Sequence, residues 1–305
     1  MAYGFLFRLY LKTMSSTPHQ PRRLVHSDSN SSIEPENNIE FQAADALASS
    51  HGDAYRGAGV LIGLLGILVV FIAVTPAGLS IENESTLVML GVAKVVLMVA
   101  ILVNVYLYGN RSKHHSEWIT YRRKAESLRY AGLKELKEKL NSNLESGDAA
   151  AVSEHLFAEL RRTLEGENGQ IAYNQRKSRQ YKSIEHFSSR LSWYGFLFVL
   201  ICAVWLLLSE LHLAPHTSLL IYGTAAVPAF VGGIHGINGL LKVESLLEEH
   251  QNMALVLQGL CGELNLANPR DSVTMLEICG RVYDHLVARD VLWAESVEKI
   301  KIKPA

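Results

Sequence analysis

The chain has 305 residues, of which 29 are Lys or Arg and 30 are Asp or Glu, so its formal net charge at pH 7 is −1. A chain this close to neutral has no bulk attraction for phosphate backbones, and we expect no nucleic-acid partner. Hydrophobic residues make up 49% of the sequence, but they are gathered in four long blocks with charged residues between them. A soluble α/β protein would spread both kinds of residue more evenly.

The first 38 residues are expected to be a disordered tail, because residues 13–40 are rich in Ser, Pro, Asn and His and can bury little apolar surface. The opening MAYGFLFRLYLK is too short to span a membrane and has no cleavage site typical of a signal peptide. It is either an interfacial helix lying on the membrane or an extension upstream of a natural start at Met14. Residues 39–57 predict a helix that leads into the first apolar block.

The four apolar blocks predict transmembrane helices over about 58–79, 87–108, 193–213 and 218–239. Each is long enough for a hydrocarbon core of about 30 Å at about 1.5 Å of rise per residue. The first and third blocks also lack the polar stripe of a helix packed in a soluble core. Short connections pair the blocks into two hairpins, within residues 39–110 and 192–239.

A few polar residues fall inside these spans. Lys94 lies about eight residues from the outer boundary, so it either snorkels to the headgroups or faces a pore or an ion-pair partner such as Glu82, Glu84 or Glu210. The other polar candidates for a pore or an intramembrane contact are Asn104, His235 and Asn238.

Two glycine pairs allow close approach between membrane helices. They are Gly59 with Gly63 in the first span and Gly232 with Gly236 in the fourth. The four-residue spacing places each pair on one helix face, which favours tight packing within the chain or between chains.

The loops indicate the orientation in the membrane. The connections at 80–86 and 209–217 contain no Lys or Arg, whereas basic residues flank the opposite ends of the spans. The positive-inside rule therefore predicts cytoplasmic N- and C-termini in a multi-pass membrane protein.

The remaining segments predict a helical cytoplasmic part. Apolar residues recur at steps of three and four over 118–140, and further helices are expected over about 148–165 and 168–190, within the cytoplasmic segment 111–191. In the C-terminal segment 240–305, a heptad-like pattern over 243–264 is followed by a helix at 272–298. The predicted fold class is all-α: a membrane bundle of two hairpins, with a cytoplasmic bundle formed by extensions of the spans.

No motif of enzyme chemistry stands out. A P-loop, a dinucleotide fingerprint, HExxH and GxSxG are all absent, so we expect no enzyme activity and no cofactor. Cys202, Cys261 and Cys279 are too far apart in sequence for a typical metal motif and are expected to be free thiols. His114 and His115 point about 100° apart on an ideal helix and cannot face one metal ion, so no metal site is predicted.

One motif, W-x-x-YR-x-x-AE-x-LR, follows the second span, and its residues are Trp118, Tyr121, Arg122, Ala125, Glu126, Leu128 and Arg129. With ADALASSHGDAYRGAGVL before the first span and FVGGIHGINGL in the fourth, it resembles bacterial membrane proteins of the SLATT type over residues 39–303. The resemblance implies an oligomeric effector of antiphage defence that permeabilises the inner membrane when a separately encoded cytoplasmic sensor detects infection. This chain departs from the family pattern at Lys94, where relatives often carry an acidic residue.

Three functions follow as hypotheses. The first is a pore-forming or membrane-disrupting effector, which requires a homo-oligomer because four spans alone enclose no aqueous path. The second is a non-enzymatic membrane scaffold that docks a cytoplasmic partner. The third is a small channel or transporter, for which Pro228 and its neighbouring glycines are the single hint of a broken helix.

Overall fold

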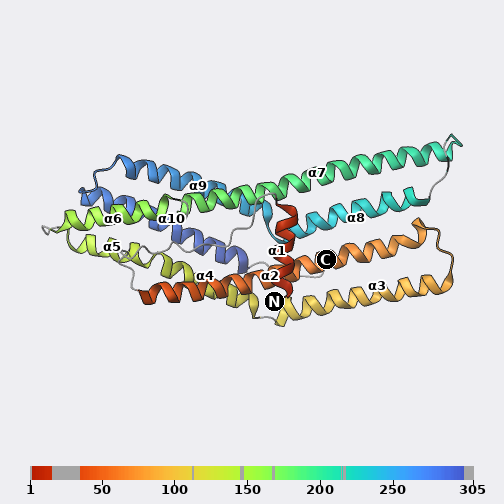
Figure 1. Ribbon diagram of the computed structural model, residues 1–305, viewed down its shortest axis with the longest axis horizontal. Coiled ribbons are helices and arrows are strands. Elements are labelled where there is room, and N and C mark those ends of the chain that lie inside the picture. Colours follow the sequence, from red (N-terminus) through yellow and green to blue (C-terminus); the bar gives the residue numbers. More distant parts are fainter. Residues whose placement is uncertain are drawn as a thin grey trace.

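The computed structural model describes residues 2–15, 35–111, 113–144, 148–166, 169–213, 215 and 218–298. Every regular element within these residues is a helix, which confirms the predicted all-α fold class. The molecule is elongated, and its four apolar helical stretches lie together at one end (Figure 1). The other end holds shorter helices and the extensions of the spans, and we call it the extramembrane half.

The four predicted spans are all present as helices. They belong to α2 (Pro35–Gly78), α3 (Glu84–Asn104), α7 (Gln170–Glu210) and α8 (Ser218–Leu240). Each has the length and apolar composition needed to cross a bilayer. The chain is therefore a multi-pass membrane protein with two helical hairpins.

The spans contact one another in the order α7, α8, α2, α3, so α7 and α3 lie at opposite ends of the group (Figure 1). Helix α3 is the least covered, and large apolar side chains remain exposed along it. They are Leu87, Val88, Met89, Val92, Val95, Val96, Met98, Val99, Leu102 and Val103. An apolar surface of this extent would be unfavourable in water and is suited to lipid or to another protein chain.

The extramembrane half has its own hydrophobic core. It is built by α5 (Ala131–Ser142), α6 (Ala149–Leu164), α9 (Val243–Leu266) and α10 (Ser272–Glu298). The fully buried side chains include Leu140, Leu156, Leu160, Leu164, Leu257, Leu264, Met275 and Val282. Since α2 and α7 run on into this half and α9 follows α8 directly, the predicted bundle of span extensions is confirmed.

The expected single stripe over 118–140 is divided between two helices. Helix α4 (His114–Arg129) ends at Tyr130, whose backbone leaves the helical region, and α5 begins at Ala131. The two helices face different cores: Trp118 packs near the spans, whereas Leu133 and Leu140 pack in the extramembrane core. Because of the break at Tyr130, the apolar residues of one continuous sequence pattern pack in two different hydrophobic clusters.

The second span does not pass directly into α4. Helix α3 gives way at Val105 to a π-helical segment, η1 (Val105–Arg111), before α4 begins at His114. In a π-helix hydrogen bonds join residues that are five positions apart rather than four, so side chains rotate relative to the preceding α-helix. Asn104, the last residue of α3, is buried at this transition.

The predicted disordered tail was wrong for residues 2–14, which form helix α1 (Ala2–Met14). Residues 16–34 lie outside the described residues. Helix α1 crosses the long axis of the molecule where the spans meet the extramembrane half (Figure 1). We call this level, marked by Gly57, Tyr108 and Asn238, the junction.

Close packing holds α1 in place at the junction. Phe7, Tyr10 and Leu11 are buried in a cluster with residues of α2, α7 and α8. Gly57 is required here, because a Cβ at this position would lie 1.8 Å from the Tyr3 carbonyl oxygen. Phe5, 65% exposed, is on the opposite side. Helix α1 therefore has apolar residues on both a buried and an exposed side. This pattern is expected if the segment is an interfacial helix, one of the two alternatives for it.

Candidate functional site

The intramembrane polar residues do not converge on one site. Lys94 is partly exposed on α3 and forms no ion pair or hydrogen bond with any described residue, including its suggested partners Glu82, Glu84 and Glu210. Asn104 is 5% exposed, and its side-chain oxygen has no hydrogen-bond partner within the described part of the chain. A buried polar atom without a hydrogen-bond partner is costly.

His235 and Asn238 instead bond to neighbouring helices. His235 Nε2 is 2.5 Å from the hydroxyl of Ser192 in α7. Asn238 donates from Nδ2 to the hydroxyl of Ser188 at 2.5 Å and accepts from the Tyr10 hydroxyl at 2.6 Å. Asn238 is therefore a structural link between α1, α7 and α8, whereas His235 keeps an exposed ring beside a hollow lined by Ser189, Ser192, Trp193 and Phe196.

The two glycine pairs have different surroundings. A Cβ on Gly59 would lie 2.2 Å from Leu240, and one on Gly63 would lie 2.3 Å from Ile237, so this pair packs against α8 as predicted. In contrast, a Cβ on Gly232 or Gly236 would meet no described atom within 4 Å. The second pair therefore does not pack within the chain, and its packing between chains stays a prediction. Gly233, next to Gly232, makes the close contact with Ile67 of α2.

The motif residues after the second span build a buried ionic cluster between α2 and α4. The Glu126 side chain is 4% exposed and accepts two hydrogen bonds from Arg129, at 2.7 and 2.9 Å, while also pairing with Arg122. Arg122 reaches across to Asp45 of α2 at 3.2 Å. Ala125 is fully buried and Leu128 half-buried on the same helix. The arginines thus hold α4 against α2.

Asp290 of α10 adds a third carboxylate to this cluster. Desolvation and the neighbouring Glu126 raise the pKa of Asp290 to about 7, although Arg122, Arg289 and Arg129 act in the opposite direction. Arg289 is itself paired with Glu249 at 3.2 Å. Burial of the Asp290 carboxyl, reinforced by the Glu126 charge, therefore outweighs the three arginines and keeps its pKa above the usual range of a carboxyl.

Aromatic side chains surround the cluster on the side nearer the spans. Trp118 packs edge-to-face on Trp293 of α10, with ring centroids 5.4 Å apart, and lies within 5.1 Å of the Arg56 guanidinium. Tyr121 stacks on His51 of α2 at 5.7 Å. The motif therefore has an evident packing role where α2, α4 and α10 meet.

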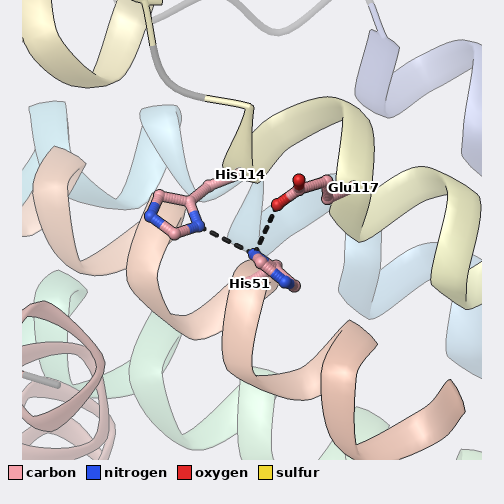
Figure 2. Close-up of side chains that lie close together, drawn as sticks. All are labelled: His51, His114 and Glu117. Carbon is pink, nitrogen blue, oxygen red and sulfur yellow. Dashed lines mark hydrogen bonds and ion pairs between the residues drawn. The ribbon is translucent and has the colours of Figure 1, made fainter.

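The same α2–α4 interface brings together two histidines and a glutamate that sequence reasoning missed. His51 Nδ1 is 2.8 Å from His114 Nδ1 and 3.2 Å from a carboxylate oxygen of Glu117 (Figure 2). All three side chains are half-buried. His115, as expected from its position on the helix, points elsewhere and packs on Tyr55 at 4.7 Å.

The three cysteines are free, as predicted, and all three are buried. Cys261 accompanies Glu165 and Asn265 at the surface of the extramembrane core, 3.1 Å from the Glu165 carboxylate. Burial and this carboxylate raise the pKa of the Cys261 thiol to about 11, so it is protonated and unreactive at neutral pH.

Fold and site together define a multi-pass, all-α membrane protein in which a helical extramembrane half is joined to the spans by a polar and aromatic junction. Comparison with known proteins adds no relative: the chain matches no protein-family model, no curated protein and no solved structure.

Proposed function

We propose that the protein is an oligomeric membrane effector of a bacterial defence system, which forms pores in the inner membrane or disrupts it. Both of its termini lie in the cytoplasm. A separately encoded sensor activates it. The resemblance of residues 39–303 to SLATT-type proteins supports the setting, and the arrangement of the spans supports the oligomer.

The proposal rests mainly on the exposed face of α8 that includes Gly232 and Gly236. Both glycines are exposed and have no described neighbour within reach of a Cβ, while Gly59, Gly63 and Gly233 are covered. Small residues at four-residue spacing allow two helix backbones to approach closely in lipid. Exposed His235 on the same helix gives this face a polar group suited to a contact between chains or to a water-filled path.

Two features of α3 favour the same proposal. Lys94 has no described partner, and the surrounding apolar side chains are uncovered. A cation in a span is costly when isolated, and assembly would offer it a partner or water. Because α3 and α7 lie at opposite ends of the group of spans, further copies can add beside either helix without displacing a contact of the single chain.

Induced expression in bacteria with a membrane-potential dye tests the activity. The wild-type chain is expected to collapse the potential, and Gly236→Leu and Lys94→Leu are expected to preserve it at equal protein level in the membrane fraction. Gly66→Leu is the matched control, because Gly66 also lies in a span with open space around it but belongs to α2. An unchanged potential with abundant wild-type protein would contradict the proposal.

Assembly is tested separately in native membranes. A Gly236→Cys variant is expected to form a disulfide-linked dimer on mild oxidation, since the native cysteines are buried. A chain that stays monomeric under these conditions would count against an oligomer built through α8.

A scaffold function is the second candidate, and exposed apolar residues of the extramembrane half favour it. Leu266 is 91% exposed at the end of α9, and Leu255 and Val273 are also largely exposed. A cytoplasmic partner that covers them would bind equally well to the Gly236→Leu variant, and the membrane potential would stay intact. Helix α8 continues without a break through Pro228, so the discontinuous helix typical of transporters is not seen there.

A further inference from the structure

We propose that His51, His114 and Glu117 form a binding site for a transition-metal ion, best suited to Zn²⁺, that clasps α2 to α4 next to the membrane. This inference is independent of the effector function, because it rests on the side chains of the junction alone.

The three ligand atoms already converge. His51 Nδ1 lies between the other two groups, with His114 at 2.8 Å and Glu117 at 3.2 Å, and all three ligand atoms lie within 4.8 Å of one another. Figure 2 shows the side chains pointing to one place from two different helices, His51 from α2 and the other two from α4. His114 and Glu117 are separated by three residues, so they occupy one face of α4.

The distances are close to those of a metal site. Zinc ligands lie about 2.0–2.2 Å from the ion, which places two ligand atoms of a tetrahedral site about 3.3 Å apart. The His51–Glu117 distance meets this value, and the two imidazoles need to separate by a few tenths of an ångström. Two histidines and one carboxylate leave a fourth position for water or another ligand, as in open zinc sites.

The surroundings hold both rings in place. Tyr121 stacks on His51 and Tyr108 stacks on His114, each with an angle of 12° between the ring planes. Rings fixed in this way lose little freedom when a metal binds, which favours binding by a site formed before the ion arrives. Imidazole and carboxylate together favour Zn²⁺ over Mg²⁺ or Ca²⁺, which prefer oxygen ligands alone.

The test uses the full-length chain in detergent, without a polyhistidine tag and stripped of metal by a chelator. Titration with Zn²⁺ against a chromogenic chelator is expected to show one tight site per chain. His51→Ala, His114→Ala and Glu117→Gln should each weaken Zn²⁺ binding by about tenfold or more. Removing a residue that only contacts a metal ligand already costs about that much, and these variants remove a ligand itself. Bound Co²⁺ is expected to give the visible absorption of a tetrahedral site in the wild type and to lose it in these variants.

His115→Ala is the matched control, since His115 is the neighbour of His114 and faces Tyr55. It should keep full affinity. Glu117 is partly exposed, so Glu117→Gln leaves the packing of the rings intact and separates lost binding from lost folding; Zn²⁺ should raise the melting temperature of the wild type and not of this variant. Absence of a tight site in the folded wild type, or equal losses in His115→Ala and His114→Ala, would overturn the proposal.

Discussion

The hydroxyl of Tyr10 in α1 donates a hydrogen bond to the side-chain oxygen of Asn238 in α8, with 2.6 Å between the two atoms. The amide of Asn238 in turn donates to Ser188 in α7. One asparagine therefore ties the helix that crosses the junction to two of the four membrane-spanning helices.

Tyr10→Phe is expected to lower stability by about 1 kcal/mol, because it removes one hydrogen bond and leaves the ring in place. Tyr10→Ala should cost more, about 3 kcal/mol, since the buried ring is also lost. Thermal unfolding in detergent measures both changes. Phe5→Ala, on the exposed side of α1, is the control and should alter the melting temperature little; an equal loss in all three variants would show that α1 is not held by its buried face.

Gly63→Ala and Gly236→Ala should have opposite effects on the single chain. The new methyl group at Gly63 would meet Ile237 at 2.3 Å, so we expect a loss of about 1–3 kcal/mol from overpacking. At Gly236 there is open space, and alanine should be neutral or stabilise the helix by up to about 1 kcal/mol. Denaturant unfolding of the purified monomer distinguishes them, and similar values for the two variants would contradict the packing of α2 on α8.

Removal of the buried Glu126 carboxylate should lower the stability of the extramembrane half strongly. Glu126→Ala removes the more buried of the two carboxylates that Arg122 and Arg129 share, the other being Asp45, and loss of one member of a buried pair costs about 3–5 kcal/mol. Glu138→Ala is the control, because Glu138 pairs loosely with Lys134 at 3.9 Å on the surface and should change stability by less than about 1 kcal/mol. Thermal or denaturant unfolding at neutral pH gives the comparison.

Asp290 should make stability fall as pH rises. Its pKa of about 7 in the folded chain lies above the ordinary value of 3.8, so folding favours the protonated form. The stabilising contribution is complete below about pH 4 and is lost as pH rises through about 7. Asp290→Asn is expected to flatten the dependence of the melting temperature on pH over this range, whereas an unchanged slope would show that another group is responsible.

Much of the fold could be predicted because it follows from solvent preference and helical periodicity. Long uncharged stretches have one favourable environment, lipid, and the three- and four-residue steps of the other segments place their apolar side chains on one face. Helix α1 could be predicted only as one of two alternatives. Its apolar run is short, and its stability comes from contacts with Gly57 and Asn238, which are distant in sequence.

The candidate sites were harder to predict because they depend on rotation and pairing. Gly232 and Gly233 differ by one position, or about 100° around the helix, and only the second contacts α2. His51 and His114 are 63 positions apart and meet because α2 packs on α4. The spacing of His114 and Glu117 on one helix face was the available signal, but half a ligand set is common by chance.

The continuity of α2 has a mechanical consequence. This helix of 44 residues, like α7 with 41, passes through the junction without interruption. In contrast, the second span turns into η1, and the fourth ends at Leu240, two residues before Lys242, whose backbone is left-handed. An unbroken α-helix is stiff along its axis, so any tilt imposed on its outer segment by a bound protein must reappear at the far leaflet. The molecule thus combines two helices that are continuous through the junction with two that change there, and a tilt of the continuous helices would have to be taken up at η1 and at Lys242.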